Sequence, residues 1–329
     1  MTNHQPHDHQ AHDHTHAHQA YAHTHGIVDP SLYSTTRGIW ALKVSFAALM
    51  ATALFQLVVV AVSGSVALLA DTIHNFGDAL TAVPLALAFV LTKRPPNRRF
   101  TYGYGHTEDL AGLAIVVLIV VSAIIIAYES INRLLNPQPV TNVFIVAFAA
   151  IIGFIGNEAV AMFRIRIGNE IGSAALVADG YHARVDGLSS LAVLVGALGV
   201  WFGFPYADPL VGLGIAILIG RIAFDAGRSV ITRMLGGVDP QVVDEIERAA
   251  QETAGVLRVG NVRVRWVGHR LNAELNIAVD DALSIRQAHA IAAEVQHNLM
   301  HHLSYLSSAT IHVDPDSASA NHHHTDGHT

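Results

Sequence analysis

Two apolar segments of the chain carry the same pattern of residues that can bind a metal ion. Residues 70–80 read ADTIHNFGDAL and residues 178–188 read ADGYHARVDGL, and both fit the pattern A-D-x-x-H-x-x-x-D-x-L. A histidine and an aspartate four positions apart lie on one face of a helix. The two pairs are His74 with Asp78 and His182 with Asp186. Two imidazoles and two carboxylates would complete a four-ligand shell around a divalent cation, so we expect a metal site between two helices.

A further aspartate precedes each histidine by three positions, at Asp71 and Asp179. From there a carboxylate can bond to an imidazole N–H, carry a proton or hold an ion waiting to enter. Hydrogen bonding between helices is the alternative role for such polar residues, but the repetition of the whole pattern favours a metal. The ligand types favour Zn(II) and also suit Co(II), Cd(II), Fe(II) or Ni(II).

The composition indicates a membrane protein. The 329 residues are 51% hydrophobic and only 14% charged, whereas soluble domains carry about 25% charged residues. There is no cysteine, which excludes disulfides and thiolate metal sites. No basic tract points to nucleic acid. A hydrolytic metal site needs an open coordination position and a general base, and no such motif is present, so we expect neither an enzyme nor a resident cofactor.

Long apolar stretches each approach the roughly 20 residues that a helix needs to cross a bilayer. Turn-forming residues, Gly168 among them, separate six candidate spans. The predicted spans are 38–62, 66–92, 107–132, 141–164, 171–201 and 207–233. Basic residues gather in the second and fourth connections, for instance Lys93 and Arg164, and positive connections face the cytoplasm. We therefore expect a multi-pass protein in the lipid of the cell membrane, with both termini cytoplasmic.

The predicted transmembrane all-α bundle occupies residues 36–235, and a cytosolic α+β domain follows at 236–315. In this domain Asp239–Pro240 and Ser284 begin two helices, and alternating strands flank a turn at Gly268. The order αββαβ predicts a ferredoxin-like or metallochaperone-like fold. The histidine-rich ends, 1–35 and 316–329, are expected to be disordered tails. They either collect metal weakly near the entrance or are passive.

The chain resembles the cation diffusion facilitator family of divalent metal/proton antiporters over about residues 36–315. The resemblance rests on the two H-x-x-x-D pairs, the YGYGHTEDLAGL opening of the third span and the C-terminal domain ending IHVDP. It implies efflux of Zn(II) or a similar ion in exchange for protons. It also implies that His74, Asp78, His182 and Asp186 form the transport site, and that the protein is a homodimer joined through its C-terminal domains.

The sequence departs from bacterial members of that family at two further metal sites. An extra site in the loop between the second and third spans cannot form here, because its positions are Asn97, Phe100 and Tyr104. Nearby His106 is expected to be a helix cap or a charge partner. In the C-terminal domain two ligand positions are Gly260 and Asn276. The positions that remain are His289, His312 and Asp314. These three could hold one ion with a further partner, or be ordinary surface residues.

Two alternatives remain open from the sequence. Glu158, in the fourth span, could relay protons or stabilise the ligands, or pair with a neighbouring basic residue. A membrane-anchored metal sensor or buffer is the rival to a transporter, but it leaves the repeated motif inside the membrane unexplained.

Overall fold

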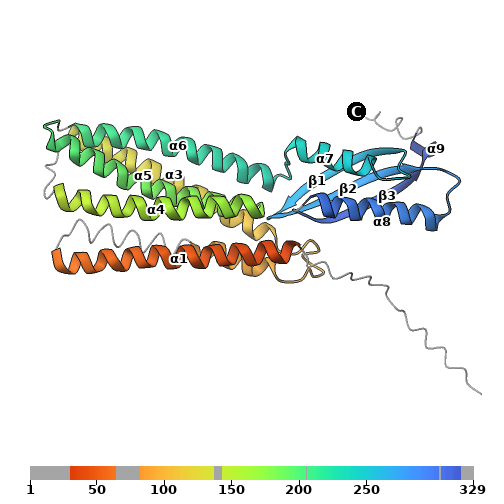
Figure 1. Ribbon diagram of the computed structural model, residues 1–329. Helices are drawn as coiled ribbons and strands as arrows, with labels where there is room; N and C mark the ends of the chain where they lie inside the picture. The colour runs from red at the N-terminus through yellow and green to blue at the C-terminus, as the bar shows by residue number, and fades with distance from the viewer. Residues whose placement is uncertain (1–29, 64–81, 137–142, 205, 304, 320–329) are drawn as a thin grey trace, which may run out of the picture.

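The computed structural model describes residues 30–63, 82–136, 143–204, 206–303 and 305–319. In this part of the chain long helices run alongside one another and form a bundle (Figure 1). These helices are α1 (Pro30–Ser63), α3 (His106–Leu135), α4 (Val143–Ile171), α5 (Ala174–Trp201) and α6 (Ala207–Met234). A shorter helical stretch, Ala82–Thr92, belongs to the second predicted span, and the rest of that span lies outside the described residues. The predicted all-α bundle is confirmed.

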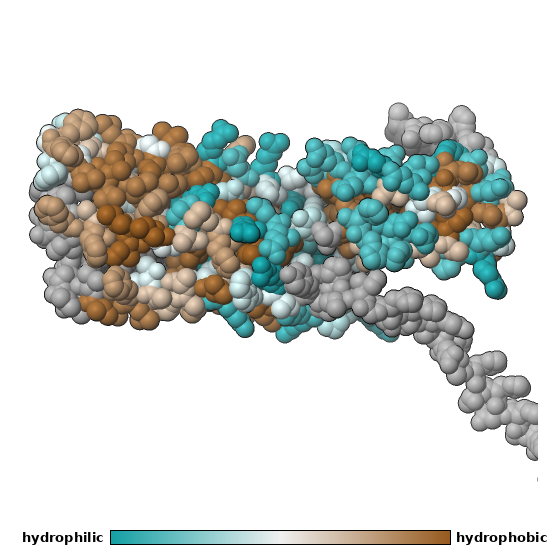
Figure 2. Space-filling view, viewed as in Figure 1, coloured by the Kyte–Doolittle hydropathy of each residue, from teal (hydrophilic) through white to brown (hydrophobic). Residues whose placement is uncertain are grey.

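The outer surface of the bundle is suited to lipid. Within the described residues, helices long and apolar enough to cross a membrane include His106–Leu135 and Ala207–Met234. The 28 residues of α6 extend about 42 Å, which exceeds a hydrocarbon core of roughly 30 Å. Large apolar side chains point outward from this helix, with Ile217 76% and Phe224 68% exposed. Figure 2 shows the bundle covered by hydrophobic residues and the C-terminal part largely by hydrophilic ones. Such a surface requires an apolar solvent.

The connection between α4 and α5 differs from the prediction. Gly168 was expected to lie in the connection after the fourth span, but α4 continues to Ile171 and the chain reverses at Gly172, which has φ +70°. Gly168 instead lies where α4 crosses α5, because a Cβ built there would be 2.9 Å from the backbone nitrogen of Val177. Glycine allows helices to approach this closely. As a consequence, Arg164 lies inside the bundle on α4 and not in a loop.

The C-terminal domain has the predicted αββαβ order. It contains α7 (Pro240–Gln251), β1 (Arg258–Val267), β2 (Arg270–Val279), α8 (Ile285–His302) and β3 (Leu306–Pro315), followed by the short α9 (Asp316–Ser319). Asp239 caps α7 by accepting a hydrogen bond from the backbone nitrogen of Gln241, and Ser284 begins α8 with a capping box. The predicted helix starts are therefore confirmed.

One sheet joins the three strands. β1 pairs antiparallel with β2, and β2 pairs parallel with β3. Alternate residues of β2, such as Leu275 and Ile277, are buried against α7 and α8 together with Ile246 and Leu299. The other residues of β2, such as Asn272, face the opposite side of the sheet. The turn between β1 and β2 contains Gly268 at φ +64° and points back toward the bundle.

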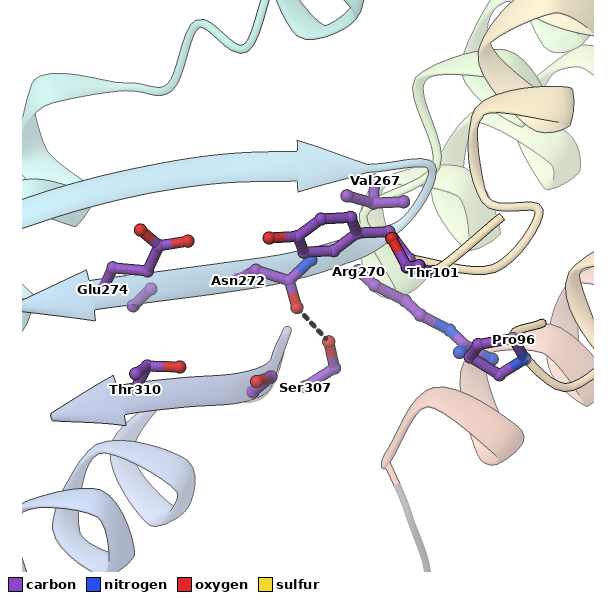
Figure 3. A pocket seen from close by; sticks show the side chains of 11 residues that line it. Pro96, Thr101, Val267, Arg270, Asn272, Glu274, Ser307 and Thr310 are labelled. Carbon is purple, nitrogen blue, oxygen red and sulfur yellow. Dashed lines mark hydrogen bonds between the residues drawn. The ribbon is translucent and has the colours of Figure 1, made fainter. Parts of the chain in front are cut away.

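A pocket of about 320 Å³ lies between the loop that precedes α3 and this opposite side of the sheet (Figure 3). Pro96 and Thr101 line it from the loop. Asn272 and Ser307 line it from the strands, and the Ser307 hydroxyl donates to the Asn272 side-chain oxygen at 3.2 Å. The loop and the sheet are therefore separated here, next to the turn where the two parts of the chain make contact.

Candidate metal site

Helix α5 presents the second copy of the motif as a buried stripe. Asp179, His182 and Asp186 are 0%, 6% and 4% exposed, respectively. Nε2 of His182 lies 4.0 Å from Oδ2 of Asp186. The two side chains are one turn apart on the same side of the helix, as the spacing predicts. An imidazole and a carboxylate this close can bind one divalent cation together.

The first copy of the motif lies outside the described residues. Asp71, His74 and Asp78 fall within residues 64–81, so the structure describes one half of the predicted four-ligand set. Among the residues that are described, no three histidine or acidic side chains gather as a metal site. The four-ligand shell itself therefore stays a prediction.

Asp179 forms an ion pair that sequence reasoning missed. Its Oδ2 is 3.0 Å from Nη1 of Arg164 on α4, and the two side chains are 0% and 1% exposed. Arg164 is among the largest fully buried side chains of the described residues. A buried guanidinium is stable only beside a negative charge, and Asp179 supplies it. The upstream aspartate therefore anchors α4 to α5, one helical turn before His182.

A second ion pair joins the same two helices. Nη2 of Arg184 on α5 lies 2.7 Å from Oε1 of Glu158 on α4, and both carboxylate oxygens of Glu158 accept hydrogen bonds from this guanidinium. Of the roles considered for Glu158, the structure shows the pairing with a basic residue. A bidentate pair of this kind holds α4 and α5 in register beside the buried stripe.

The C-terminal candidate ligands are only partly brought together. His312 and Asp314 are close on β3, with Nε2 of the first 3.0 Å from Oδ1 of the second. The other oxygen of Asp314 accepts a hydrogen bond from the Asn276 amide at 3.0 Å. His289 lies on α8 and lines a separate hollow with Asp280. Within the described residues of the chain, these side chains do not form a three-ligand group.

A cluster of buried polar side chains where the bundle meets the C-terminal domain was also missed. Nδ1 of His269, which follows the turn glycine, is 2.6 Å from Oε2 of Glu108, and both side chains are buried. Glu108 belongs to the GHTED stretch, in which His106 also bonds to Asp109 at 2.8 Å, as a charge partner. A lone histidine beside a turn glycine was the only local signal, because the two partners are 161 positions apart.

Taken together, apolar helices, ligand-type side chains buried in α5 and an appended α+β domain define a membrane protein that handles cations. Residues 42–235 match the family model for the cation efflux transmembrane domain, and residues 238–316 match the model for the cation efflux protein cytoplasmic domain. The chain belongs to the cation efflux family, also called the cation diffusion facilitators, and is a multi-pass membrane protein. This is a family of divalent-metal transporters.

Relatives support the same assignment over most of the chain. A probable cation efflux system protein of Mycobacterium tuberculosis is 54% identical over 88% of this chain and 87% of its own length. A manganese efflux system protein of Bacillus subtilis is 27% identical over 77% of this chain and 88% of its own. A cadmium, cobalt and zinc/H(+)-K(+) antiporter of Bacillus subtilis is 28% identical, covering 73% and 78%. The relatives thus differ in the metals for which they are named.

Proposed function

We propose that this protein exports Zn(II), or a similar divalent cation, from the cytosol in exchange for protons. His74, Asp78, His182 and Asp186 form the transport site, with Asp71 and Asp179 beside it. The observation that carries the proposal is the buried His182–Asp186 pair on α5, because ionisable side chains inside a spanning helix are costly and are retained for function. The repeated motif supplies the other two ligands.

Proton exchange follows from the ligand types. A metal-bound imidazole must be neutral and a metal-bound carboxylate ionised, so protons and metal compete for the same atoms. Histidine ordinarily titrates at about pH 6.5, so a more acidic outer face favours release of the ion. The antiporter named for cadmium, cobalt and zinc is a relative that exchanges metal for H(+) and K(+), which supports this reading.

Zn(II) is proposed over Mn(II) because of the imidazoles. Two imidazoles with two carboxylates suit Zn(II), Co(II) or Cd(II), whereas Mn(II) prefers oxygen ligands. One relative is named for manganese, so the preference for Zn(II) over Mn(II) has to be measured.

We further propose that the protein is a homodimer in the plasma membrane with both termini in the cytoplasm. In each chain the transmembrane domain spans residues 36–235 and the cytosolic domain spans residues 236–315. Cross-linking in native membranes tests the homodimer, and a purely monomeric chain contradicts it.

Metal uptake into proteoliposomes with an imposed pH gradient tests the transport function. The purified wild-type protein is compared with Asp186→Ala over a panel of Zn(II), Co(II), Cd(II) and Mn(II). We expect gradient-dependent flux that favours Zn(II) and that Asp186→Ala abolishes, because one ligand of a closed shell is lost. Asp225→Ala is the matched control, since Asp225 is an exposed aspartate of α6 whose partner Arg221 is also exposed.

The outcomes separate the parts of the proposal. Wild-type flux through the Asp186→Ala protein sinks the site assignment. Flux that ignores the pH gradient removes proton exchange and leaves the transport site. Metal binding without any flux favours the sensor or buffer alternative.

A further inference from the structure

His269 is completely buried between the two parts of the chain. Its side chain is 0% exposed, and that of Glu108 is 1% exposed. Nδ1 of His269 bonds to Oε2 of Glu108 at 2.6 Å, and Nε2 lies 3.0 Å from the Thr35 hydroxyl on α1. One imidazole of the C-terminal domain thus contacts two different helices of the bundle. We refer to Thr35, Glu108, Ser173 and His269 as the joint.

The joint continues to the helix that carries the candidate metal ligands. The Ser173 hydroxyl bonds to the other carboxylate oxygen, Oε1, of Glu108. Oγ of Ser173 also accepts the backbone N–H of Leu176 at 3.1 Å, so Ser173 caps the N-terminus of α5. His182 follows nine positions later, about 13 Å along the helix axis. Glu108 therefore connects the imidazole of the C-terminal domain directly to the start of α5.

The backbone also makes close contacts beside the joint. We call this interface between the β1–β2 turn and the neighbouring helix ends the seam. A Cβ built on Gly268 would be 2.7 Å from the carbonyl oxygen of Gly105, and one on Gly105 would be 2.5 Å from the carbonyl oxygen of Val267. Arg233, at the end of α6, stacks over Trp266 with 4.3 Å from Cζ to the ring centroid. The same guanidinium donates to the Gly172 carbonyl, just before α5. The start of α3 therefore meets the β1–β2 turn, and the end of α6 links Trp266 of β1 to the backbone just before α5.

The β1–β2 turn packs closely against the bundle on one side, and a pocket lies on its other side. Val267 and Arg270 flank Gly268 and His269, and both line the pocket of about 320 Å³ beneath the loop before α3 (Figure 3). Figure 3 shows the Arg270 side chain extending toward Pro96 of that loop. The open space leaves room for the sheet to move relative to this loop, while the hydrogen-bonded contact on the other side of the turn persists.

We propose that His269 is a positioning residue of the transport cycle. Its imidazole holds Glu108 against Ser173 and so sets the position of the N-terminus of α5 relative to the C-terminal domain. When α5 moves during transport, the movement passes through the joint and the C-terminal domain turns with it. A buried, charge-assisted cluster is suited to this role, because its hydrogen bonds are strong and reinforce one another in surroundings of low dielectric constant. The inference rests on the proposed function.

Fluorescence of Trp266 provides a test that a merely structural role does not satisfy. Trp266 lies in the seam, and replacing Trp40 and Trp201 with Phe leaves it as the only tryptophan. In this background we expect Zn(II) to change the Trp266 emission, and Asp186→Ala to abolish the change. His269→Ala should also abolish the change while metal still binds. It should lower the maximal flux about tenfold or more with little effect on the half-saturating metal concentration.

Two further variants sharpen the test. His269→Asn keeps a donor near the position of Nδ1 and should restore part of both the emission change and the flux. His302→Ala is the matched control and should leave both readouts unchanged. His302 is an exposed histidine whose Nδ1 bonds within its own helix, to the Asn298 carbonyl at 2.8 Å. If His269→Ala fails to fold, Glu108→Gln keeps the shape of the side chain and carries the same expectation.

The inference is overturned if the His269→Ala protein keeps the Zn(II)-dependent change of Trp266 emission together with wild-type flux. It is equally overturned if the emission change persists in Asp186→Ala, because the signal then does not come from α5. Failure of the proposed function is distinct, since it appears as absent wild-type flux or as normal flux in Asp186→Ala, whatever His269 does.

Discussion

Replacing Gly268 with alanine should destabilise the protein far more than the same change at another glycine with positive φ. Gly268 has φ +64°, where an L side chain costs about 1–2 kcal/mol. In addition, the new Cβ would lie 2.7 Å from the Gly105 carbonyl oxygen and 3.0 Å from a carboxylate oxygen of Glu108. The Gly105 carbonyl belongs to the backbone and cannot move away at low energetic cost, so overpacking adds about 1–3 kcal/mol. The expected total is about 2–5 kcal/mol.

Gly236 provides the control. It has φ +80° in the link after α6, and a Cβ there meets nothing within 4 Å. Gly236→Ala should therefore cost only the backbone term, about 1–2 kcal/mol. The difference between the two variants, about 1–3 kcal/mol, isolates the contact between the β1–β2 turn and α3.

Thermal unfolding of the detergent-solubilised proteins, at one scan rate and one protein concentration, measures this difference. At about 2–4 °C per kcal/mol, Gly268→Ala should melt roughly 2–12 °C below Gly236→Ala. Equal midpoints for the two variants would mean that the β1–β2 turn does not pack closely against the start of α3, which would contradict the contact described at the seam.

Three further predictions concern the bundle and its ends. Arg164→Met alone should destabilise the protein by about 3–5 kcal/mol, because a buried carboxylate loses its partner. Adding Asp179→Leu should recover most of the loss in thermal unfolding, and a double variant as unstable as the single one would contradict this. Changing His74 and His182 together to Asp should shift competition transport from Zn(II) toward Mn(II), since carboxylates prefer harder ions; an unchanged preference would place selectivity elsewhere. Deleting residues 1–25 should leave the maximal rate intact and raise the half-saturating Zn(II) concentration, because the tail concentrates ions locally; superimposed flux curves would make it a passive end, and complete loss of flux would place it in the path.

The amino-acid sequence by itself determined the features that depend on neighbours along the chain. Helix starts at Asp239 and Ser284 were predictable because a cap bonds to backbone only two or three positions away. The spacing of His182 and Asp186 determined that both lie on one side of α5. The long apolar runs determined the spanning helices, because a bilayer demands continuous apolar length. The family was recognisable from the sequence for the same reason, because its motifs are defined by residue spacings along the chain.

Only the tertiary structure decided which distant side chains meet. Arg164 was placed in a loop because Gly168 is an ordinary breaker, whereas close packing of α4 on α5 requires that glycine within a helix and buries the guanidinium beside Asp179. His269 and Glu108 are far apart in sequence and become partners only because the β1–β2 turn reaches the start of α3. Periodicity reports which face of an element is buried but carries no information on the element that covers it. The joint therefore became visible only once the helices and the sheet were in place.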